Sequence, residues 1–279
     1  MLAQSFSISP TELWNVLGTP HAPQLIDVRR RDIYESVAGL LPASRWCEPT
    51  ALADWIGTLD RARPIVIACK AGKELSQTIT AELRAAGYDA AMLAGGQGAW
   101  QDAGLPTIDR ATADRIMPKR PSTLSSSTWI TRRRPKIDRI ACPWLIRRFI
   151  DADAKFLFVD PDYVEAAAAE FGGIPFDIAN VEISHDGERC SFDTLLKLFK
   201  LEREPSLARL ALIVRGADTA RPDLAPEAAG LHAVSLGLSA LAGDDDHGLL
   251  KQGFVIYDAL FAWLRFAADE KHNWPAKVA

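Results

Sequence analysis

The amino-acid sequence predicts an α/β protein in two parts: an open parallel sheet flanked by helices, then a mainly α-helical (α+β) second domain. Over about the first hundred residues, short apolar segments of strand length alternate with helix signals, which is typical of a parallel sheet. Helical periodicity dominates the second half. Between them, residues 109–128 contain two prolines and a serine-rich run, a composition typical of a linker. We therefore expect domains at residues 1–108 and 129–279, the second able to fold alone.

The N-terminal part begins with a clearly marked helix. Ser9 and Glu12 form a capping box and Pro10 occupies the first helical position, so we expect a helix from there to Leu17. Uncharged apolar runs predict buried strands, and glycine or capping residues bound the helices. The other predicted elements are strands at 24–28, 65–68 and 90–93, helices at 50–58 and 76–86, and a short helix around Trp100.

The second part is predicted to be mostly helical. Residues 155–159 alternate like a strand, whereas 210–214 suit either a strand or a helix. The predicted helices cover 138–149, 161–171, 191–199, 225–241 and 246–268.

Composition and charge exclude several classes of protein. The net charge is −4, from 32 basic and 36 acidic residues, so the whole chain has no electrostatic attraction for nucleic acid. No apolar run approaches the roughly 20 residues of a membrane span, and residues 1–10 lack the pattern of a secretory signal. The four cysteines have no C-x-x-C spacing and do not suggest a disulfide framework. We expect a cytoplasmic protein with reduced thiols.

Cys69 directly follows the apolar run at 65–68, and a tight loop connects it to the next helix. The backbone N–H groups of such a loop add to the positive end of the helix, which favours a thiolate, a bound oxyanion or a sulfur atom carried as a persulfide. The alternative is a small buried cysteine without a chemical role. The succession of strand, cysteine, glycine and helix cap favours Cys69 as the nucleophile. The candidate substrate-binding residues beside it are Lys70, Ala71, Gly72, Lys73, Glu74, Leu75 and the expected helix cap Ser76.

Several ordered motifs lie within residues 8–108. They are Asp27-Val28-Arg29, the loop from Cys69 to Ser76, Leu93-Ala94-Gly95-Gly96 with Trp100, and Ala103-Gly104-Leu105-Pro106. In this order the motifs resemble rhodanese-like sulfurtransferase domains. The resemblance implies that Cys69 accepts and donates sulfur, and that the loop amides hold an oxyanion above it.

Two features of the loop depart from this family. Many active rhodaneses have an arginine where this chain has Leu75. The seven residues from Cys69 to Leu75 also make the loop one residue longer than is usual in sulfurtransferases, which is similar to the dual-specificity phosphatases of the same fold. Those phosphatases require the arginine, and neither Lys70 nor Lys73 can supply its bidentate binding. We therefore expect a wide cradle that binds tetrahedral dianions weakly.

A second set of ordered segments extends from residue 129 to about residue 268. It begins at residues 129–146 and continues through 156–159, 175–177, 184–185, 188–192, 214–218 and 257–260. These segments resemble the C-terminal domain of the chromate-resistance family ChrB. The resemblance implies a link to chromate resistance, as an oxyanion sensor or a handling factor.

Nine basic residues and one acidic residue, Asp138, lie between positions 118 and 150. Such a cluster suits a small dianion such as chromate, sulfate or phosphate. A basic face tied to acidic neighbours is the alternative of equal weight, and no helix-turn-helix signature supports nucleic-acid binding. The candidate anion-binding residues are Arg132, Arg134, Lys136 and Arg139.

The second part also contains side chains from which a divalent-metal site could be built. His185, Cys190 and Asp218 are of suitable types, and Asp258 could join them. One histidine and one cysteine at no diagnostic spacing favour the alternative, a hydrogen-bonded structural histidine.

Together these observations predict a rhodanese-type sulfurtransferase coupled to a ChrB-type domain, acting in chromate or oxyanion stress through Cys69. The alternative is a non-catalytic oxyanion sensor or regulator. The expected partner is a small anion such as thiosulfate or chromate, with neither nucleic acid nor membrane, and homo-oligomers are left open. The sulfur chemistry requires no cofactor.

Overall fold

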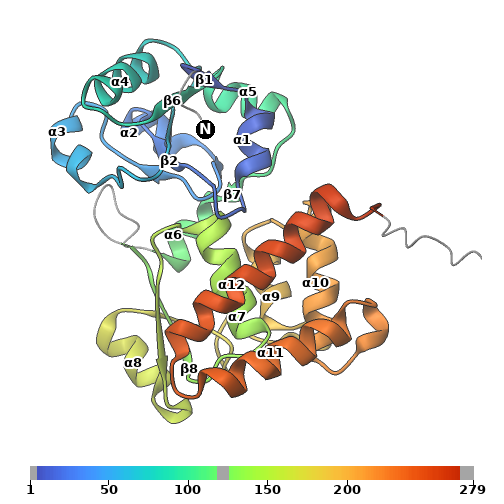
Figure 1. Cartoon of the computed structure of the whole chain (residues 1–279). Coiled ribbons are helices and arrows are strands. Elements are labelled where there is room, and N and C mark those ends of the chain that lie inside the picture. The colour runs from blue at the N-terminus through green and yellow to red at the C-terminus, as the bar shows by residue number, and fades with distance from the viewer. Residues whose placement is uncertain (1–4, 118–125, 271–279) are drawn as a thin grey trace, which may run out of the picture.

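The structure, a computed structural model, describes residues 5–117 and 126–270. The N-terminal half, at the top of Figure 1, contains a five-stranded sheet with helices around it, and the second half combines a small sheet with a group of helices. The larger sheet has the order β1-β6-β5-β2-β4, and each neighbouring pair is parallel. The predicted fold class is confirmed.

The N-terminal half follows the predicted alternation of strands and helices. Its strands are β1 (Ser7–Ile8), β2 (Gln24–Asp27), β3 (Gly39–Leu40), β4 (Arg45–Trp46), β5 (Ile65–Ala68), β6 (Ala90–Leu93) and β7 (Ile108–Asp109). Its helices are α1 (Pro10–Val16), α2 (Arg31–Ser36), α3 (Leu52–Trp55) with the 3-10 turn η1 (Ile56–Thr58), α4 (Glu74–Ala85), α5 (Gly96–Asp102) and α6 (Arg110–Ile116).

Strand β5 lies inside the sheet and is buried on both faces. Val66 belongs to the hydrophobic cluster on the side of Trp100 in α5, and Ile67 to the cluster on the side of Leu83 in α4. Alternate residues of a strand point to opposite faces, so a strand covered on both sides needs a continuous apolar sequence. Cys69 directly follows the last residue of this strand, so it lies at the C-terminal end of the parallel strands, next to the loops that leave the sheet there.

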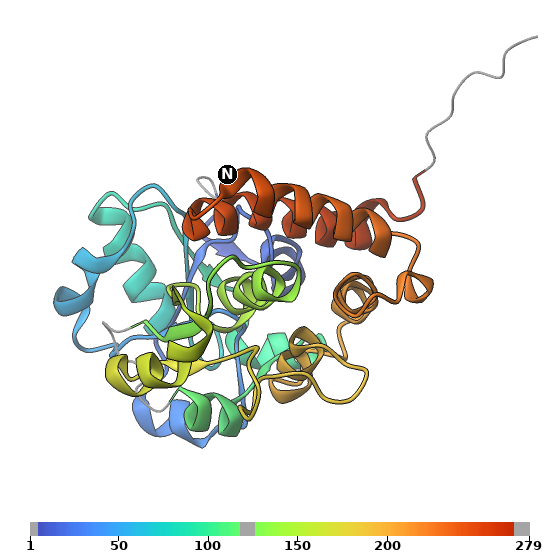
Figure 2. The same cartoon turned by 90° about the horizontal axis from the view of Figure 1, so that it is seen from below.

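The second half is mostly helical, as predicted. Its parallel sheet has the order β10-β8-β9, and seen from below, α7 lies in the interior beside α12 (Figure 2). Residues 210–214, for which strand and helix were both open, are helical. The strands are β8 (Thr128–Arg132), β9 (Lys155–Val159) and β10 (Ile174–Pro175). The helices are α7 (Asp138–Leu145), α8 (Val164–Phe171), α9 (Ser191–Leu198), α10 (Pro205–Asp218), α11 (Ala228–Ala242) and α12 (Asp246–Ala262), with short turns η2 (Ile146–Ile150), η3 (Pro161–Tyr163), η4 (Pro222–Leu224) and η5 (Trp263–Ala267).

The first part of the predicted linker is instead regular structure. Strand β7 pairs antiparallel with β3, and Asp109 accepts a hydrogen bond from the backbone of Thr112 to begin α6. Ala113 and Ile116 are buried in the hydrophobic cluster to which both halves contribute. This short helix contributes too few apolar side chains to show a period in the sequence. Residues 118–125 of the expected linker lie outside the described residues.

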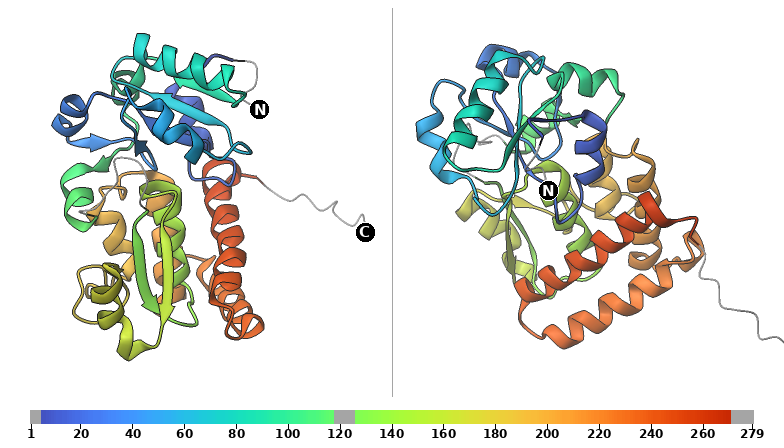
Figure 3. Two further views of the ribbon diagram at one scale, coloured as in Figure 1. Left: turned by 90° about the vertical axis from the view of Figure 1, so that its left-hand side faces the viewer. Right: turned by 45° about the horizontal axis from the view of Figure 1, so that its top comes forward.

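The two halves share one hydrophobic core. The rings of Trp14 and Phe149 lie with their centroids 6.0 Å apart across the boundary. Gly18 has φ +79°, and a Cβ atom there would lie 2.5 Å from the Phe149 ring. Arg265, just beyond α12, donates hydrogen bonds of 3.0 Å to the carbonyls of Leu17 and Trp14, where the end of this helix reaches the N-terminal half (Figure 3). The packing therefore argues against the expectation that residues 129–279 fold independently.

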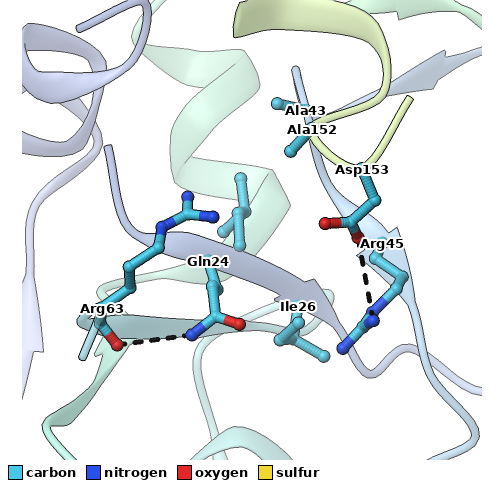
Figure 4. Close-up of a pocket in the computed structure, with 8 residues that line it drawn as sticks. Gln24, Ile26, Ala43, Arg45, Arg63, Ala152 and Asp153 are labelled. Carbon is cyan, nitrogen blue, oxygen red and sulfur yellow. Dashed lines mark hydrogen bonds and ion pairs between the residues drawn. The ribbon is translucent and has the colours of Figure 1, made fainter. Parts of the chain in front are cut away.

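A second contact between the halves is polar. A small pocket of about 20 Å³ lies there, and Arg45 reaches Asp153 at 3.8 Å beside it (Figure 4). Among the described residues, no helix is both long and apolar enough to cross a membrane.

Candidate functional site

Cys69 lies between the end of β5 and the start of α4. Residues 69–73 form this turn, Lys73 is the N-cap residue, and Gly72 adopts φ +62°. The sequence placed the helix cap at Ser76, but helix α4 begins earlier and Ser76 lies in its first turn. The turn is therefore tighter than the expected seven-residue cradle, and the thiol lies directly at the N-terminal end of a twelve-residue helix.

Hydrogen bonds converge on the Cys69 sulfur. The Gly72 N–H donates to Sγ at 3.2 Å, and the Ser76 hydroxyl lies 3.2 Å from the same atom. Burial raises the pKa of Cys69, but hydrogen bonds from Ser76 and from the backbone of Ala71, Lys73 and Gly72 outweigh it, so that the pKa falls below the ordinary value of a thiol. The loop thus favours the thiolate, as the sequence predicted.

Gly95 and Gly96, which follow β6, pack against the backbone of the Cys69 loop. A Cβ atom on Gly96 would lie 2.7 Å from the backbone nitrogen of Gly72, so no side chain fits there. The Gln97 N–H donates to the Cys69 carbonyl at 2.9 Å. Satisfying this carbonyl from α5 leaves the N–H groups of the loop free to face the sulfur.

A pocket of about 250 Å³ opens over Cys69. Arg29 lines it but is 2% exposed, and its Nε bonds to both carboxylate oxygens of Asp27 at 2.9 Å, so its charge is neutralised locally. Arg30 and Ile33, which follow β2, also line the pocket and were not predicted from the sequence. The Asp27-Val28-Arg29 motif lies at the C-terminal end of β2, the strand next to β5, and this position could have indicated that the residues after it lie near Cys69. The lining residues are Arg29, Arg30, Ile33, Cys69, Lys70, Ala71, Lys73, Glu74 and Leu75.

The basic residues predicted to bind an anion in the second half have a different environment. Arg132 and Arg139 both form ion pairs with Asp177, at 2.8 and 3.2 Å. Arg134 is exposed and Lys136 is half-buried. Two of the four candidates are therefore occupied by an internal carboxylate, which corresponds to the alternative of a basic face tied to acidic neighbours.

The three predicted metal-ligating residues do lie together, and two further carboxylates join them. The His185 Nε2 atom lies 3.2 Å from Asp218 Oδ2, 3.3 Å from Asp138 Oδ2 and 3.6 Å from Asp177 Oδ1. Asp138, Cys190 and Asp218 offer ligand atoms that all lie within 4.8 Å of one another. Asp138 and Asp177 carried no sequence signal because neither stands at a motif spacing from His185.

The carboxylate of Asp258, the fourth candidate, binds other side chains and is not part of this cluster. It accepts hydrogen bonds of 2.8 Å from the Arg148 guanidinium and from the Trp144 indole. Asp258 therefore fixes α12 against α7.

The cluster carries strongly perturbed pKa values. The hydrogen bond with Asp138 raises the pKa of His185 to about 9, against the effect of burial. Burial and the nearby Asp138 raise the pKa of Asp218 to about 7, and they also raise that of Asp177. Burial, with the nearby Asp138, raises the pKa of the Cys190 thiol far above its usual range. Negative charge is crowded here, so each carboxylate disfavours the ionisation of its acidic neighbours.

Comparison with known proteins assigns each half of the chain to a family model. Residues 9–103 match the family model of the rhodanese-like domain, and residues 129–264 match that of the ChrB C-terminal domain. Protein ChrB of Cupriavidus metallidurans is 33% identical over 156 residues, which cover 56% of this chain and 46% of that protein. The chain therefore spans less than half the length of this curated relative.

Two solved structures are similar to the N-terminal half. A rhodanese-like domain protein from Staphylococcus aureus is 29% identical with a TM-score of 0.32, covering 37% of this chain and 97% of that one. A thiosulfate sulfurtransferase from Pseudomonas aeruginosa is 29% identical with a TM-score of 0.34, covering 39% of this chain and 20% of that one. From the family models, this chain carries a rhodanese-like domain at residues 9–103 followed by a ChrB C-terminal domain at residues 129–264.

Proposed function

We propose that this protein is a sulfurtransferase that carries sulfur on Cys69 as a persulfide, in a chromate or oxyanion stress response to which its ChrB domain links it. The observation that carries the proposal is the Cys69 thiol itself, which accepts a hydrogen bond from the Gly72 N–H and lies in hydrogen-bond contact with the Ser76 hydroxyl at the N-terminus of α4. A thiol with a lowered pKa is a nucleophile near neutral pH.

The reaction with thiosulfate as donor consists of two displacements. The Cys69 thiolate attacks the outer sulfur of thiosulfate, a new S–S bond forms, and sulfite leaves with the electron pair of the broken bond. An acceptor such as cyanide then attacks the outer sulfur of the persulfide, thiocyanate leaves, and the thiolate is regenerated. The exposed side chains of Arg30, Lys70 and Lys73 line the pocket and supply positive charge for the anions.

We expect the activity to be modest, because Leu75 stands where an arginine would give bidentate binding. Leu75 lines the pocket and packs on the cluster between the sheet and α4. A lysine at the pocket mouth is a point charge on a flexible stem and orients an oxyanion less well.

The test is a thiosulfate:cyanide assay on the full chain. Wild type should be active and Cys69→Ser should be at background. Cys47→Ala is the matched control, because burial raises the pKa of Cys47 to about 11 and it should take no part. Mass spectrometry after thiosulfate exposure should find one added sulfur on the peptide containing Cys69. Equal activity in wild type and Cys69→Ser, or no persulfide and no turnover with any sulfur donor, would exclude the proposal.

The second candidate function is a non-catalytic oxyanion sensor, which the absence of an arginine at Leu75 favours. In that case chromate binds over Cys69 without sulfur transfer. Chromate binding by wild type that is lost in a Lys70→Ala, Lys73→Ala double variant, together with no turnover, would select the sensor.

A further inference from the structure

Five metal-ligating side chains from distant parts of the second half converge on one place. Asp138 begins α7, and Asp218 ends α10. Asp177 and His185 lie in the irregular segment between β10 and α9, and Cys190 is the N-cap residue of α9. Asp138, Asp177 and His185 form one group and Asp138, Cys190 and Asp218 another, and within each group the possible ligand atoms lie within 4.8 Å of one another.

Neighbouring acidic side chains show how this part of the protein normally neutralises buried carboxylates. Asp177 is paired with two arginines, Asp193 is held by both nitrogens of the Arg215 fork, and Asp258 by Arg148. In residues 5–117 and 126–270, neither Asp138 nor Asp218 has a lysine or arginine in an ion pair. Asp138 is nevertheless only 3% exposed.

The imidazole of His185 cannot satisfy these carboxylates alone. Its Nε2 atom has at most one proton and faces three carboxylate oxygens between 3.2 and 3.6 Å away. The carboxylate oxygens that Asp138 and Asp218 offer also lie within 4.8 Å of each other, and two negative charges at this distance repel. A cation placed where the Nε2 proton points would bond to the nitrogen and to the carboxylates at the same time.

The surroundings of the cluster hold its ligands in place. The Ser191 hydroxyl donates to Asp177 Oδ1 at 2.8 Å, and its backbone N–H donates to Asp138 Oδ2 at 3.3 Å. Partners of this kind orient metal-ligating carboxylates in known sites. His185 has a side chain 44% exposed, so an ion can enter from solvent.

We propose that Asp138, His185 and Asp218 bind one divalent transition-metal ion, with Asp177 and Cys190 beside it. One imidazole with several carboxylates suits first-row divalent ions such as Zn²⁺ and Mn²⁺. The site rests on the second half alone and is independent of the sulfur chemistry at Cys69.

The experiment uses the full chain, stripped with a chelator and then dialysed separately against Zn²⁺ and Mn²⁺. Elemental analysis after desalting should find one ion per chain with at least one of the two metals, and titration calorimetry should give a saturable isotherm. Asp218→Asn and His185→Gln should each weaken binding at least tenfold. His232→Gln on α11 and Asp223→Asn in η4 are the controls and should bind as wild type does.

Folding is checked on the same samples. The two ligand variants change the more exposed members of the cluster, and without metal their thermal unfolding should resemble that of wild type. Metal should raise the unfolding temperature of wild type and of the controls, but not of the ligand variants. If a ligand variant does not fold, Co²⁺ added to wild type replaces it as the test, and visible absorption bands of a nitrogen- and oxygen-ligated ion should appear. Substoichiometric binding by folded wild type, equal binding by the ligand variants, or no Co²⁺ bands would overturn the proposal.

Discussion

The loop around Cys69 and the cluster around His185 both hold negative charge away from bulk water, but they do so with different parts of the chain. At Cys69 the stabilising groups are backbone N–H groups and one hydroxyl, all within residues 69–76. Around His185 the charges are side chains from α7, from α10 and from the segment between β10 and α9. Fixed backbone dipoles lower the pKa of a thiol, whereas crowded carboxylates raise one another's pKa.

The two sites differ in how their charge is balanced. The cradle of Cys69 is complete within one turn and one helix end, so a ligand adds to a site that is already formed. The His185 cluster combines three carboxylates with one imidazole and the two arginines on Asp177, and within the described residues neither Asp138 nor Asp218 forms an ion pair with a lysine or an arginine.

Because the two halves share one core, Phe149→Ala should destabilise both of them, and it has the largest effect that we expect. Phe149 is fully buried and contacts Trp14 on one side and Phe261 on the other. We expect a loss of about 3–5 kcal/mol in the free energy of unfolding. Chemical denaturation followed by probes in each half should still show one transition.

The control for this variant is Phe171→Ala, because Phe171 is 56% exposed and should change stability by no more than about 0.5 kcal/mol. Two separate transitions, with the N-terminal one unaffected by Phe149→Ala, would show instead that the halves fold independently as the sequence suggested.

Gly72→Ala tests whether the backbone shape of the loop creates the thiol site. A Cβ atom there would lie 2.5 Å from the nitrogen of Gly95, and the φ of +62° is unfavourable for alanine. Left-handed backbone costs about 1–2 kcal/mol and overpacking about 1–3 kcal/mol, so we expect a loss of about 2–5 kcal/mol and at least tenfold less sulfurtransferase activity.

Gly104→Ala is the matched control, since Gly104 has φ +66° with nothing within 4 Å of the added carbon. The free energy of unfolding of Gly104→Ala should fall only by the cost of placing alanine in left-handed backbone, and its sulfurtransferase activity should equal that of wild type. Equal effects of the two variants on activity would mean that the tight approach of Gly72 to Gly95 has no role in the site.

Ser76→Ala should remove one hydrogen bond from the sulfur atom of Cys69. Such a bond to a charged group is worth about 1.5–3 kcal/mol, so the pKa of Cys69 should rise by about 1–2 units. Because the wild-type pKa is lowered, alkylation by iodoacetamide at pH 7 should then slow by about 10- to 100-fold, and its pH profile should move upward.

Thr80→Val provides the control on the same helix. The Thr80 hydroxyl is buried without a hydrogen-bond partner in the described structure, and its loss should leave the alkylation profile of Cys69 unchanged. An unshifted profile in Ser76→Ala would assign the lowered pKa to the backbone alone.

Leu75→Arg should have the smallest effect, because its site is at the edge of the pocket. We expect the KM for thiosulfate to fall a few-fold, equivalent to about 1 kcal/mol, with higher salt reducing the gain. Leu75→Gln loses the same apolar packing without adding charge and should not lower KM. If both variants behave alike, no anion reaches this side of the loop.

The sequence predicted the elements whose patterns are long or whose ends are marked. Strand β5 is an uninterrupted apolar run, and the capping box of Ser9 with Glu12 is present as expected. Strands β1, β3 and β7 have two residues each, too few for any period, and they form only because neighbouring strands offer partners.

The same reason explains the sites. The residues of the Cys69 loop are contiguous, so their order revealed the loop, although the start of α4 was misplaced because Lys73, not Ser76, is its N-cap residue. Asp138 stands in a basic stretch and Asp177 in an irregular segment, and only the packing of α7 against α9 and α10 brings them to His185.

Helix α7 begins at Asp138, and its continuation η2 carries Phe149 into the boundary with Trp14. The continuous helical segment formed by α7 and η2 therefore connects the His185 cluster to the N-terminal half. A ligand that binds only the folded cluster adds RT ln(1 + [L]/Kd) to the free energy of unfolding of everything that unfolds with it, about 2.7 kcal/mol at a hundred times Kd. Ligand occupancy of the His185 cluster would then determine what fraction of the protein has an unfolded, protease-sensitive N-terminal half. It would thereby determine the lifetime of the protein in the presence of proteases.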